Sequence, residues 1–362
     1  MDTVKDYIDF VRYCIDDNQS CPRISDWRGL FLFFKQQALL GVGFRGLEKL
    51  KSDGVGIPKD ILINWYAVSE QIRKRNKDVN RRCAELTRLL KGDGFDSCIL
   101  KGQGNTLLYP EPYLRMPGDI DILVVPPGRP SIRERRNIIM SYVRQRFPNT
   151  RVRYQHIDYP IYRDTEVEVH FIPTAKNNPL YNRRIQMWVE ERIEEQCRNV
   201  VDLPDGVGQI SIPTIEFNII YQLSHLMHHF FDEGIGLRQM MDYYFLIHRL
   251  QTIDNVGLEK ELRFLGLRKF AGAVMYVMQE VFGMKEERLL VPVDERRGKL
   301  LLEEILKGGN FGQHSGLTKH SVGVKYLLKI KRNLRFAREY PAEALCEPIF
   351  RTWHFFWRLC NK

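Results

Sequence analysis

Two aspartates separated by one residue, Asp119 and Asp121, begin the apolar run Asp119-Ile-Asp-Ile-Leu-Val-Val125. The turn-prone segment Arg115-Met-Pro-Gly118 directly precedes the run, which is therefore expected to be a strand. Because side chains alternate between the faces of a strand, both carboxylates point to one face and the isoleucines to the other. Two carboxylates this close beside a core repel each other unless a cation neutralises them. The run predicts a sheet with one buried face and a site for divalent metal on the other.

A second acidic strand is expected at Glu166-Val-Glu-Val-His-Phe171, with Glu166, Glu168 and His170 on one face. If this strand pairs near the aspartates, Glu168 becomes the third carboxylate. Glu166 is the alternative, since a two-residue slip in register would exchange Glu166 and Glu168 without changing which face of the strand is buried. Three oxygen donors suit Mg²⁺ or Mn²⁺. His170 either orients a carboxylate or completes the polar face of the sheet.

A glycine-containing segment, Lys101-Gly-Gln-Gly-Asn105, follows the short strand expected at 98–100 and precedes a loop or short helix. Glycines allow backbone N–H groups to approach phosphates, and a helix N-terminus adds positive potential. Lys101 and Arg115 could neutralise the charge of a triphosphate. Gly102 is expected to serve the backbone geometry of the turn.

The hydrophobic period changes along the chain. Residues 1–91 show helical spacing, 92–212 contain the expected strands with an amphipathic helix at 133–147, and 213–362 return to helical spacing. The expected strands are 98–100, 119–125, 152–157, 159–162 and 166–171, with a short extended piece at 209–212. This order predicts an α+β fold in which a small mixed sheet lies between N-terminal and C-terminal helical regions.

Composition limits the class of protein. The 362 residues carry a net charge of +10, which favours an anionic partner such as a nucleotide, and nucleic acid remains open. Seven scattered cysteines without CxxC spacing argue against a disulfide framework or zinc site and favour a reducing compartment. No signal peptide and no apolar run of about 20 residues is present, so a cytoplasmic protein without a membrane span is expected.

These motifs together resemble a known superfamily. Leu100-Lys-Gly102, Tyr109-Pro-Glu-Pro-Tyr-Leu-Arg115, Gly118-Asp-Ile-Asp-Ile-Leu-Val124 and an acidic-x-His strand are similar to the nucleotidyltransferases of the DNA polymerase β type. The resemblance is greatest to an uncharacterised bacterial nucleotidyltransferase-like branch. That branch has a downstream helical element similar to Gly236-Leu-Arg-Gln-Met-Met-Asp242. The similar motifs span about 100 to 242. Gly102-Gln103 departs from the Gly-Ser or Gly-Gly of many members.

The resemblance implies a palm-like core that binds an NTP with magnesium and transfers a nucleoside monophosphate. Asp119, Asp121 and Glu168 would be metal ligands and catalytic carboxylates, and Glu168 could also be the base for the acceptor hydroxyl. The implied nucleotide-binding residues, listed together, are Lys101, Gly102, Gln103, Arg115, Arg238 and Asp242. The expected cofactor is Mg²⁺ or Mn²⁺, and ATP is the expected nucleotide. The acceptor stays open among protein, RNA, a small molecule and a sugar.

Other interpretations stay open. A catalytically silent nucleotide-binding or interaction protein could keep this fold, and an RNA-directed nucleotide-adding enzyme would bind nucleic acid in a salt-dependent way. Arg238 and Asp242, four residues apart, could also be an ordinary helical side-chain pair. The histidines at 225, 228 and 229 are assigned to packing or hydrogen bonding rather than to a metal. The basic segment 325–335 has the pattern of a surface helix.

Overall fold

A computed structural model describes residues 2–252, 254–310 and 322–360. It is a mixed α+β structure, as the sequence predicts. The chain forms two compact units, each assembled from separate segments. The helical unit comprises Met1–Asn76, Leu108–Met116 and His229–Arg332, and the sheet unit comprises Lys77–Leu107, Pro117–His228 and Asn333–Lys362. The sequential division at 91/92 and 212/213 stays a prediction. No helix of the described residues is long and apolar enough to cross a membrane.

The helical unit packs short amphipathic helices around aromatic side chains. Its elements, several of which share residues with the sheet unit, are α1 (Asp2–Ile15), α2 (Trp27–Gln36), α3 (Leu40–Ser52), the first half of α4 (Lys59–Gly92), η1 (Pro112–Leu114), α10 (Leu237–His248), α11 (Asn255–Phe264), α12 (Arg268–Phe282), η3 (Glu286–Arg288), α13 (Glu295–Gly308) and most of α14 (Val322–Leu334). The rings of Phe34 and Trp65 lie 5.5 Å apart with Phe10 beside them, and all three side chains are buried. Burial of these large rings stabilises the junction of α1, α2 and α4.

The sheet unit is built around four strands. Its elements are the second half of α4, β1 (Asp96–Ile99), α5 (Gln103–Thr106), β2 (Ile120–Val125), α6 (Ile132–Arg146), β3 (His156–Asp158), β4 (Val167–His170), α7 (Pro179–Glu190), α8 (Ile193–Arg198), β5 (Val200–Asp202), η2 (Pro204–Gly206), β6 (Gln209–Ser211), most of α9 (Ile215–Asp232) and α15 (Pro341–Cys360). The strand order is β1-β2-β4-β3, in which β2 and β4 are parallel and the other pairs antiparallel. β5 and β6 form a separate two-stranded sheet.

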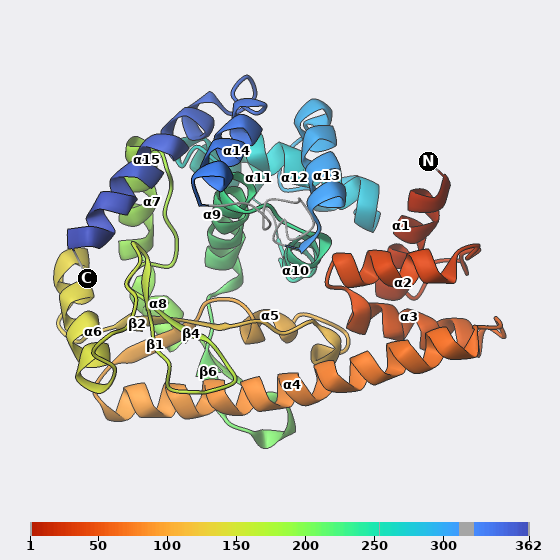
Figure 1. The fold of residues 1–362 in the computed structure, drawn as a ribbon, viewed down its shortest axis with the longest axis horizontal. Helices are drawn as coiled ribbons and strands as arrows, with labels where there is room; N and C mark the ends of the chain where they lie inside the picture. Colours follow the sequence, from red (N-terminus) through yellow and green to blue (C-terminus); the bar gives the residue numbers. More distant parts are fainter. Residues whose placement is uncertain (1, 253, 311–321, 361–362) are drawn as a thin grey trace. The chain divides into compact units, whose positions relative to one another are not determined.

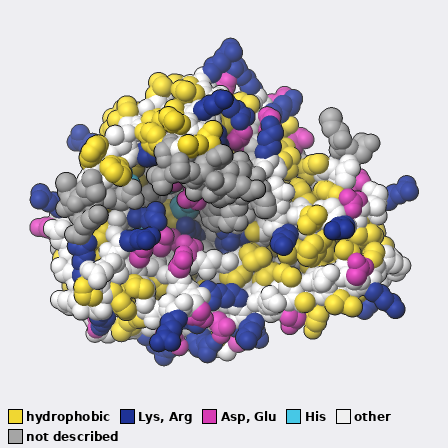
Figure 2. All heavy atoms as spheres, in the orientation of Figure 1, with side chains coloured by type: hydrophobic (Ala, Val, Ile, Leu, Met, Phe, Trp, Pro, Cys, Tyr) yellow, Lys and Arg dark blue, Asp and Glu magenta, His cyan; other side chains and the backbone are white. Residues whose placement is uncertain are grey.

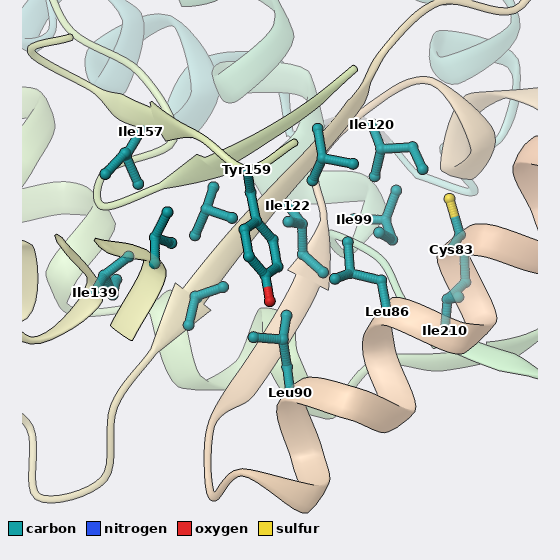
Figure 3. Packing of buried hydrophobic residues seen from close by; sticks show 14 of the residues in the cluster. Cys83, Leu86, Leu90, Ile99, Ile120, Ile122, Ile139, Ile157, Tyr159 and Ile210 are labelled. Atoms are coloured by element: carbon teal, nitrogen blue, oxygen red, sulfur yellow. The ribbon is translucent and has the colours of Figure 1, made fainter. Parts of the chain in front are cut away.

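One face of the four-stranded sheet is apolar apart from Ser97 of β1, which pairs with Val124. Ile120 and Ile122 of β2 point from this face toward Leu86 and Leu90 of α4, and Tyr159 lies among them (Figure 3). The second half of α4 contributes Leu86 and Leu90 to this core, and α6 contributes Ile139. Figure 1 shows that half of α4 beside the strands. Because alternate residues face opposite ways, the polar residues of β2, β3 and β4 all lie on the other face.

Two expected strands differ in the structure. Residues 159–162 are not a strand, and 152–157 contributes one isolated bridge between Val152 and Ile157 before β3 begins at His156. Tyr159 still donates its backbone N–H to Val167, but the next residue is Pro160. Proline has no N–H to donate, so the ladder ends there.

Candidate metal and nucleotide site

Three carboxylates lie together on the polar face of the sheet. The parallel register of β2 and β4 places Asp121 directly beside Glu168. Asp119 immediately precedes β2, and oxygen atoms of Asp119, Asp121 and Glu168 all lie within 4.8 Å of one another. Glu166, two residues before Glu168, is exposed and precedes β4. The register therefore brings Glu168 rather than Glu166 to the aspartates.

The three carboxylates have unequal electrostatic surroundings. The charge of Asp121, helped by burial, raises the pKa of Asp119 to about 6. Burial alone would also raise the pKa of Asp121, but Lys101 and His170 outweigh that effect and hold it below its ordinary value. Burial would raise the pKa of Glu168, but the hydrogen bond from His170 and the charges of His156 and His170 together lower it. Repulsion by the other carboxylates therefore destabilises mainly the charged form of Asp119, and a bound divalent cation would relieve it.

The donor set fits a hard divalent cation. All three ligating groups offer oxygen, and the side chains lie half-buried or buried at the edge of a rigid strand pair. Mg²⁺ and Mn²⁺ prefer oxygen ligands and retain several waters, which partly open sites such as this one accommodate. Asp119, Asp121 and Glu168 are therefore the residues that would hold such an ion.

Lys101 is the positive neighbour of this cluster. Its Nζ lies 3.1 Å from Oδ2 of Asp121 and 3.0 Å from Nε2 of His225 on α9. Burial lowers the pKa of Lys101, but attraction by Asp121 and the other two carboxylates outweighs it, so the pKa lies above its ordinary value. A lysine that remains charged and half-buried at this position can attract an anionic ligand to the cluster.

The segment after β1 turns sharply. Gly102 has φ +59° and ψ −108°, and an added Cβ would lie 3.4 Å from the backbone oxygen of Asp119. Glycine adopts this positive φ without strain, in agreement with the backbone role expected from sequence. Gln103 begins α5, is buried and donates a hydrogen bond to Asn80. α5 is four residues long and begins directly after Gly102.

Three predicted nucleotide-binding residues belong to the helical unit. Arg115 donates two hydrogen bonds of 2.7 Å, from Nε and Nη2, to the two carboxylate oxygens of Asp242. Tyr109 donates a further bond of 2.7 Å to Asp242, and Arg238 donates to the carbonyl oxygen of Met116 at 3.2 Å. Arg115, Arg238 and Asp242 are all buried, so they form an internal polar cluster of this unit. Their nucleotide-binding role stays a prediction.

Two histidines of the sheet unit lie beside the cluster without having been among the predicted site residues. His225 hydrogen-bonds with Lys101, which agrees with its assignment to packing or hydrogen bonding. His156 lies 3.2 Å from Glu168 through its Nδ1, because β3 pairs with β4. Only its place near the end of the strand expected at 152–157 could have indicated that position. His170 lies 3.0 Å from Asp121 and 3.5 Å from Glu168, and these carboxylates, against the effect of burial, raise its pKa to about 9.

Among the described residues, the basic side chains expected to attract an anionic partner form no separate patch on the face that Figure 2 shows. On the face in Figure 2, Lys and Arg side chains are interspersed with Asp and Glu side chains. In the segment 325–335, Lys329 pairs with Asp232 at 2.9 Å and Arg332 with Glu304 at 3.0 Å. Part of the charge of this helix is therefore used in packing of the helical unit.

Comparisons with known proteins identify the family. None of the curated proteins matches this chain. A crystal structure of an antigenic nucleotidyltransferase-like protein from Paracoccidioides brasiliensis is similar over 61% of this chain and 96% of that chain, at 13% sequence identity and a TM-score of 0.38. A family model described as "Uncharacterised nucleotidyltransferase" matches residues 24–283. Since that match spans most of the sequence, this chain belongs to the uncharacterised nucleotidyltransferase family.

Proposed function

We propose that this protein transfers a nucleoside monophosphate from an NTP, with ATP as the expected substrate, to a hydroxyl of an acceptor molecule. The observation that supports this most directly is the convergence of Asp119, Asp121 and Glu168 within 4.8 Å on the polar face of the sheet. Membership of a nucleotidyltransferase family agrees with the proposal. A buried acidic cluster beside a core is costly unless it binds cations, so a structural purpose alone accounts for it poorly.

The proposed roles follow from the surroundings of each group. Asp119, Asp121 and Glu168 would hold Mg²⁺ or Mn²⁺. When bound, such ions stabilise charge on the transferred group and the leaving pyrophosphate. Lys101, held 3.1 Å from Asp121, would present a positive charge to the triphosphate. Glu168, whose side chain is 27% exposed, would accept the proton of the acceptor hydroxyl.

The backbone of Gly102 and Gln103 would contact phosphate oxygens, as glycine-containing turns before helices commonly do. Arg115, Arg238 and Asp242 complete the proposed nucleotide-binding residues. Arg115 and Asp242 are joined to each other by two hydrogen bonds, so their contribution would be to keep the loop at 108–116 in its observed conformation.

Labelled nucleotides provide the test. The full-length protein is incubated with a cell extract and Mg²⁺, in parallel with ATP labelled at the α-phosphate and ATP labelled at the γ-phosphate. We expect α-label on an acceptor, with release of pyrophosphate, and no transfer of γ-label. The double variant Asp119→Asn with Asp121→Asn should lose transfer, whereas Asp60→Asn, which changes an exposed carboxylate on α4, should retain it.

Three results would contradict the proposal. Transfer of γ-label would indicate kinase chemistry. Transfer of α-label by the double variant would remove the two aspartates from the mechanism. ATP binding that needs no metal and survives in the double variant, without transfer by the wild-type protein, would indicate a passive nucleotide-binding protein.

A further inference from the structure

A second group of possible metal ligands lies next to the three carboxylates. β3 and β4 are antiparallel, and their register places His156 opposite His170 and Asp158 opposite Glu168. Alternation along the two strands puts these four side chains on the polar face of the sheet. His156, Glu168 and His170 each offer one atom to a cluster whose members lie within 4.8 Å of one another. Glu168 is thus common to this group and to the carboxylate cluster.

The distances within the group agree with metal coordination. Nδ1 of His156 lies 3.2 Å from Oε2 of Glu168, and Nε2 of His170 lies 3.5 Å from the same oxygen. Zinc binds histidine nitrogen and carboxylate oxygen at about 2.0–2.2 Å, so neighbouring ligands of a tetrahedral ion are separated by about 3.3–3.6 Å. One small cation could therefore bind all three groups with little movement of the strands.

The remaining nitrogens of the two imidazoles face oxygen atoms. Nδ1 of His170 lies 3.3 Å from the backbone carbonyl oxygen of Ile172, which can only accept a hydrogen bond. That contact favours the proton on Nδ1 and turns Nε2 toward the carboxylates. Nε2 of His156 is buried and has no hydrogen-bond partner among the described residues, and the carboxylate of Asp158 lies 3.8 Å away. Metal-binding histidines usually direct their second nitrogen to a carbonyl or a carboxylate in this way.

We propose that His156, Glu168 and His170 form a second metal site, for a divalent cation of the Zn²⁺ class, beside the carboxylate cluster. Two nitrogens and one oxygen favour such a cation over Mg²⁺, whereas the three oxygens of the carboxylate cluster favour Mg²⁺. Both imidazoles approach Oε2 of Glu168, which leaves Oε1 for the other cluster. The ion would displace the proton through which His170 pairs with Asp121 and Glu168.

The shared carboxylate makes the two sites interdependent. If Glu168 bridges two ions, zinc at the histidine site changes the affinity of the carboxylate cluster for magnesium, and magnesium changes the affinity for zinc by the same factor. Three protein ligands also leave an open coordination position on a tetrahedral ion, as in zinc sites that bind a water or a substrate. The histidine site is thus placed to bind an anionic group as well as the cation.

Metal binding by the full-length protein tests the proposal. Metal-free protein is titrated with Zn²⁺ by calorimetry, and with Co²⁺ as a spectroscopic probe whose visible absorption differs between low-coordinate nitrogen-containing sites and six-coordinate oxygen sites. We expect one Zn²⁺ per chain that Mg²⁺ in excess does not displace. His156→Gln should weaken Zn²⁺ binding by roughly 100-fold and remove the low-coordinate Co²⁺ band. His248→Gln, which changes an exposed histidine on α10, is the matched control and should bind Zn²⁺ as the wild type does.

Asp158→Asn keeps the test informative if the buried His156→Gln variant fails to fold. It leaves all three ligands in place and alters only the oxygen that faces His156, so Zn²⁺ binding should weaken roughly tenfold. Zinc affinity equal to that of the wild type in Asp158→Asn, or in a folded His156→Gln variant, would overturn the proposal, as would a Co²⁺ spectrum of six-coordinate type. So would a complete lack of zinc binding by the wild-type protein.

The outcome is separable from that of the proposed function. Transfer of α-label without zinc binding would refute the histidine site and leave the transferase proposal intact. Zinc binding that depends on His156, in a protein that transfers no label with any nucleotide, would refute the transferase proposal and support the histidine site.

Discussion

The buried ion pair between Arg115 and Asp242 gives a sharp stability prediction. Asp242 accepts two hydrogen bonds from Arg115 and one from Tyr109, each 2.7 Å long, and the side chains of Arg115 and Asp242 are 5% and 6% exposed. Asp242→Asn removes the charge with little change in volume, so no cavity forms. It leaves the guanidinium of Arg115 buried without a compensating carboxylate, which is the costly way to break such a pair.

The magnitude follows from these contacts. A hydrogen bond to a charged group contributes about 1.5–3 kcal/mol, and two of them join Arg115 to Asp242. Two effects reduce the loss: the variant no longer buries a charged carboxylate, and the asparagine oxygen can still accept a hydrogen bond from Arg115. Removing one partner of a buried pair therefore costs about 3–5 kcal/mol in free energy of unfolding. Asp17 forms an ion pair with Arg45, and its side chain is 69% exposed. Asp17→Asn should therefore lower the free energy of unfolding by only about 0–1 kcal/mol.

The pH dependence has a defined sign. Burial raises the pKa of Asp242, but Arg115 outweighs it, and the pKa lies below its ordinary value in the folded protein. A carboxyl group of this kind contributes stability that is complete above its unfolded pKa of about 3.9 and is lost as the pH falls toward its folded pKa. The difference between wild type and Asp242→Asn should be constant from neutral pH to about pH 5. It should shrink below about pH 4.

Equilibrium urea unfolding, followed by circular dichroism across this pH range, measures the effect. A loss no larger than that of Asp17→Asn would refute the structural interpretation of the pair. So would a difference between wild type and Asp242→Asn that grows on acidification. Normal stability combined with weaker ATP binding would assign Asp242 to the nucleotide instead.

Three further predictions concern local structure. Gly102→Ala should lower the free energy of unfolding by about 1–3 kcal/mol because φ of residue 102 is +59°. Gly92→Ala should not lower it, since a Cβ added at residue 92 meets open space. Urea unfolding of the two variants measures the difference. Leu90→Ala should cost about 2–5 kcal/mol in the same assay, since the side chain is fully buried against the sheet, and a loss below 1 kcal/mol would contradict this packing. Trp65→Phe should cost about 1–3 kcal/mol because the carbonyl oxygen of Leu40 loses its 2.6 Å hydrogen bond from the indole; an unchanged unfolding midpoint would show that water replaces that bond.

Short-range pattern predicted the core elements of the sheet unit well. The strand at β2 and the acidic strand at β4 follow from alternation of apolar and polar residues, and the helix at α4 follows from its 3.6-residue period. The strand prediction is wrong where a single side chain changes the local structure. Pro160 ends the ladder one residue beyond Tyr159, although its surroundings have the alternation of a strand.

The alternation of apolar and polar residues does not determine which strands pair, or in which register. The sequence limits the third carboxylate to Glu166 or Glu168, and only the pairing of Asp121 with Glu168 across two parallel strands distinguishes them. The parallel arrangement arises because the chain passes through α6 and β3 before returning as β4. Spacing along one strand carries no information about that return, so the choice depends on tertiary structure.

The least predictable feature is the set of cationic neighbours around Asp121. Lys101 approaches from the turn after β1 and His170 from β4, so that both carboxylate oxygens have a positive neighbour at 3.0–3.1 Å. Asp119, two residues earlier on the same face, has a pKa raised to about 6, whereas that of Asp121 is lowered. Two aspartates that are equivalent by pattern thus differ in pKa because of partners that lie 20 to 49 residues away in the chain. Asp121 has Lys101 and His170 in direct contact, whereas the pKa of Asp119 stays raised despite the charge of Lys101. Relief of the repulsion on Asp119 is therefore the stronger driving force for metal binding.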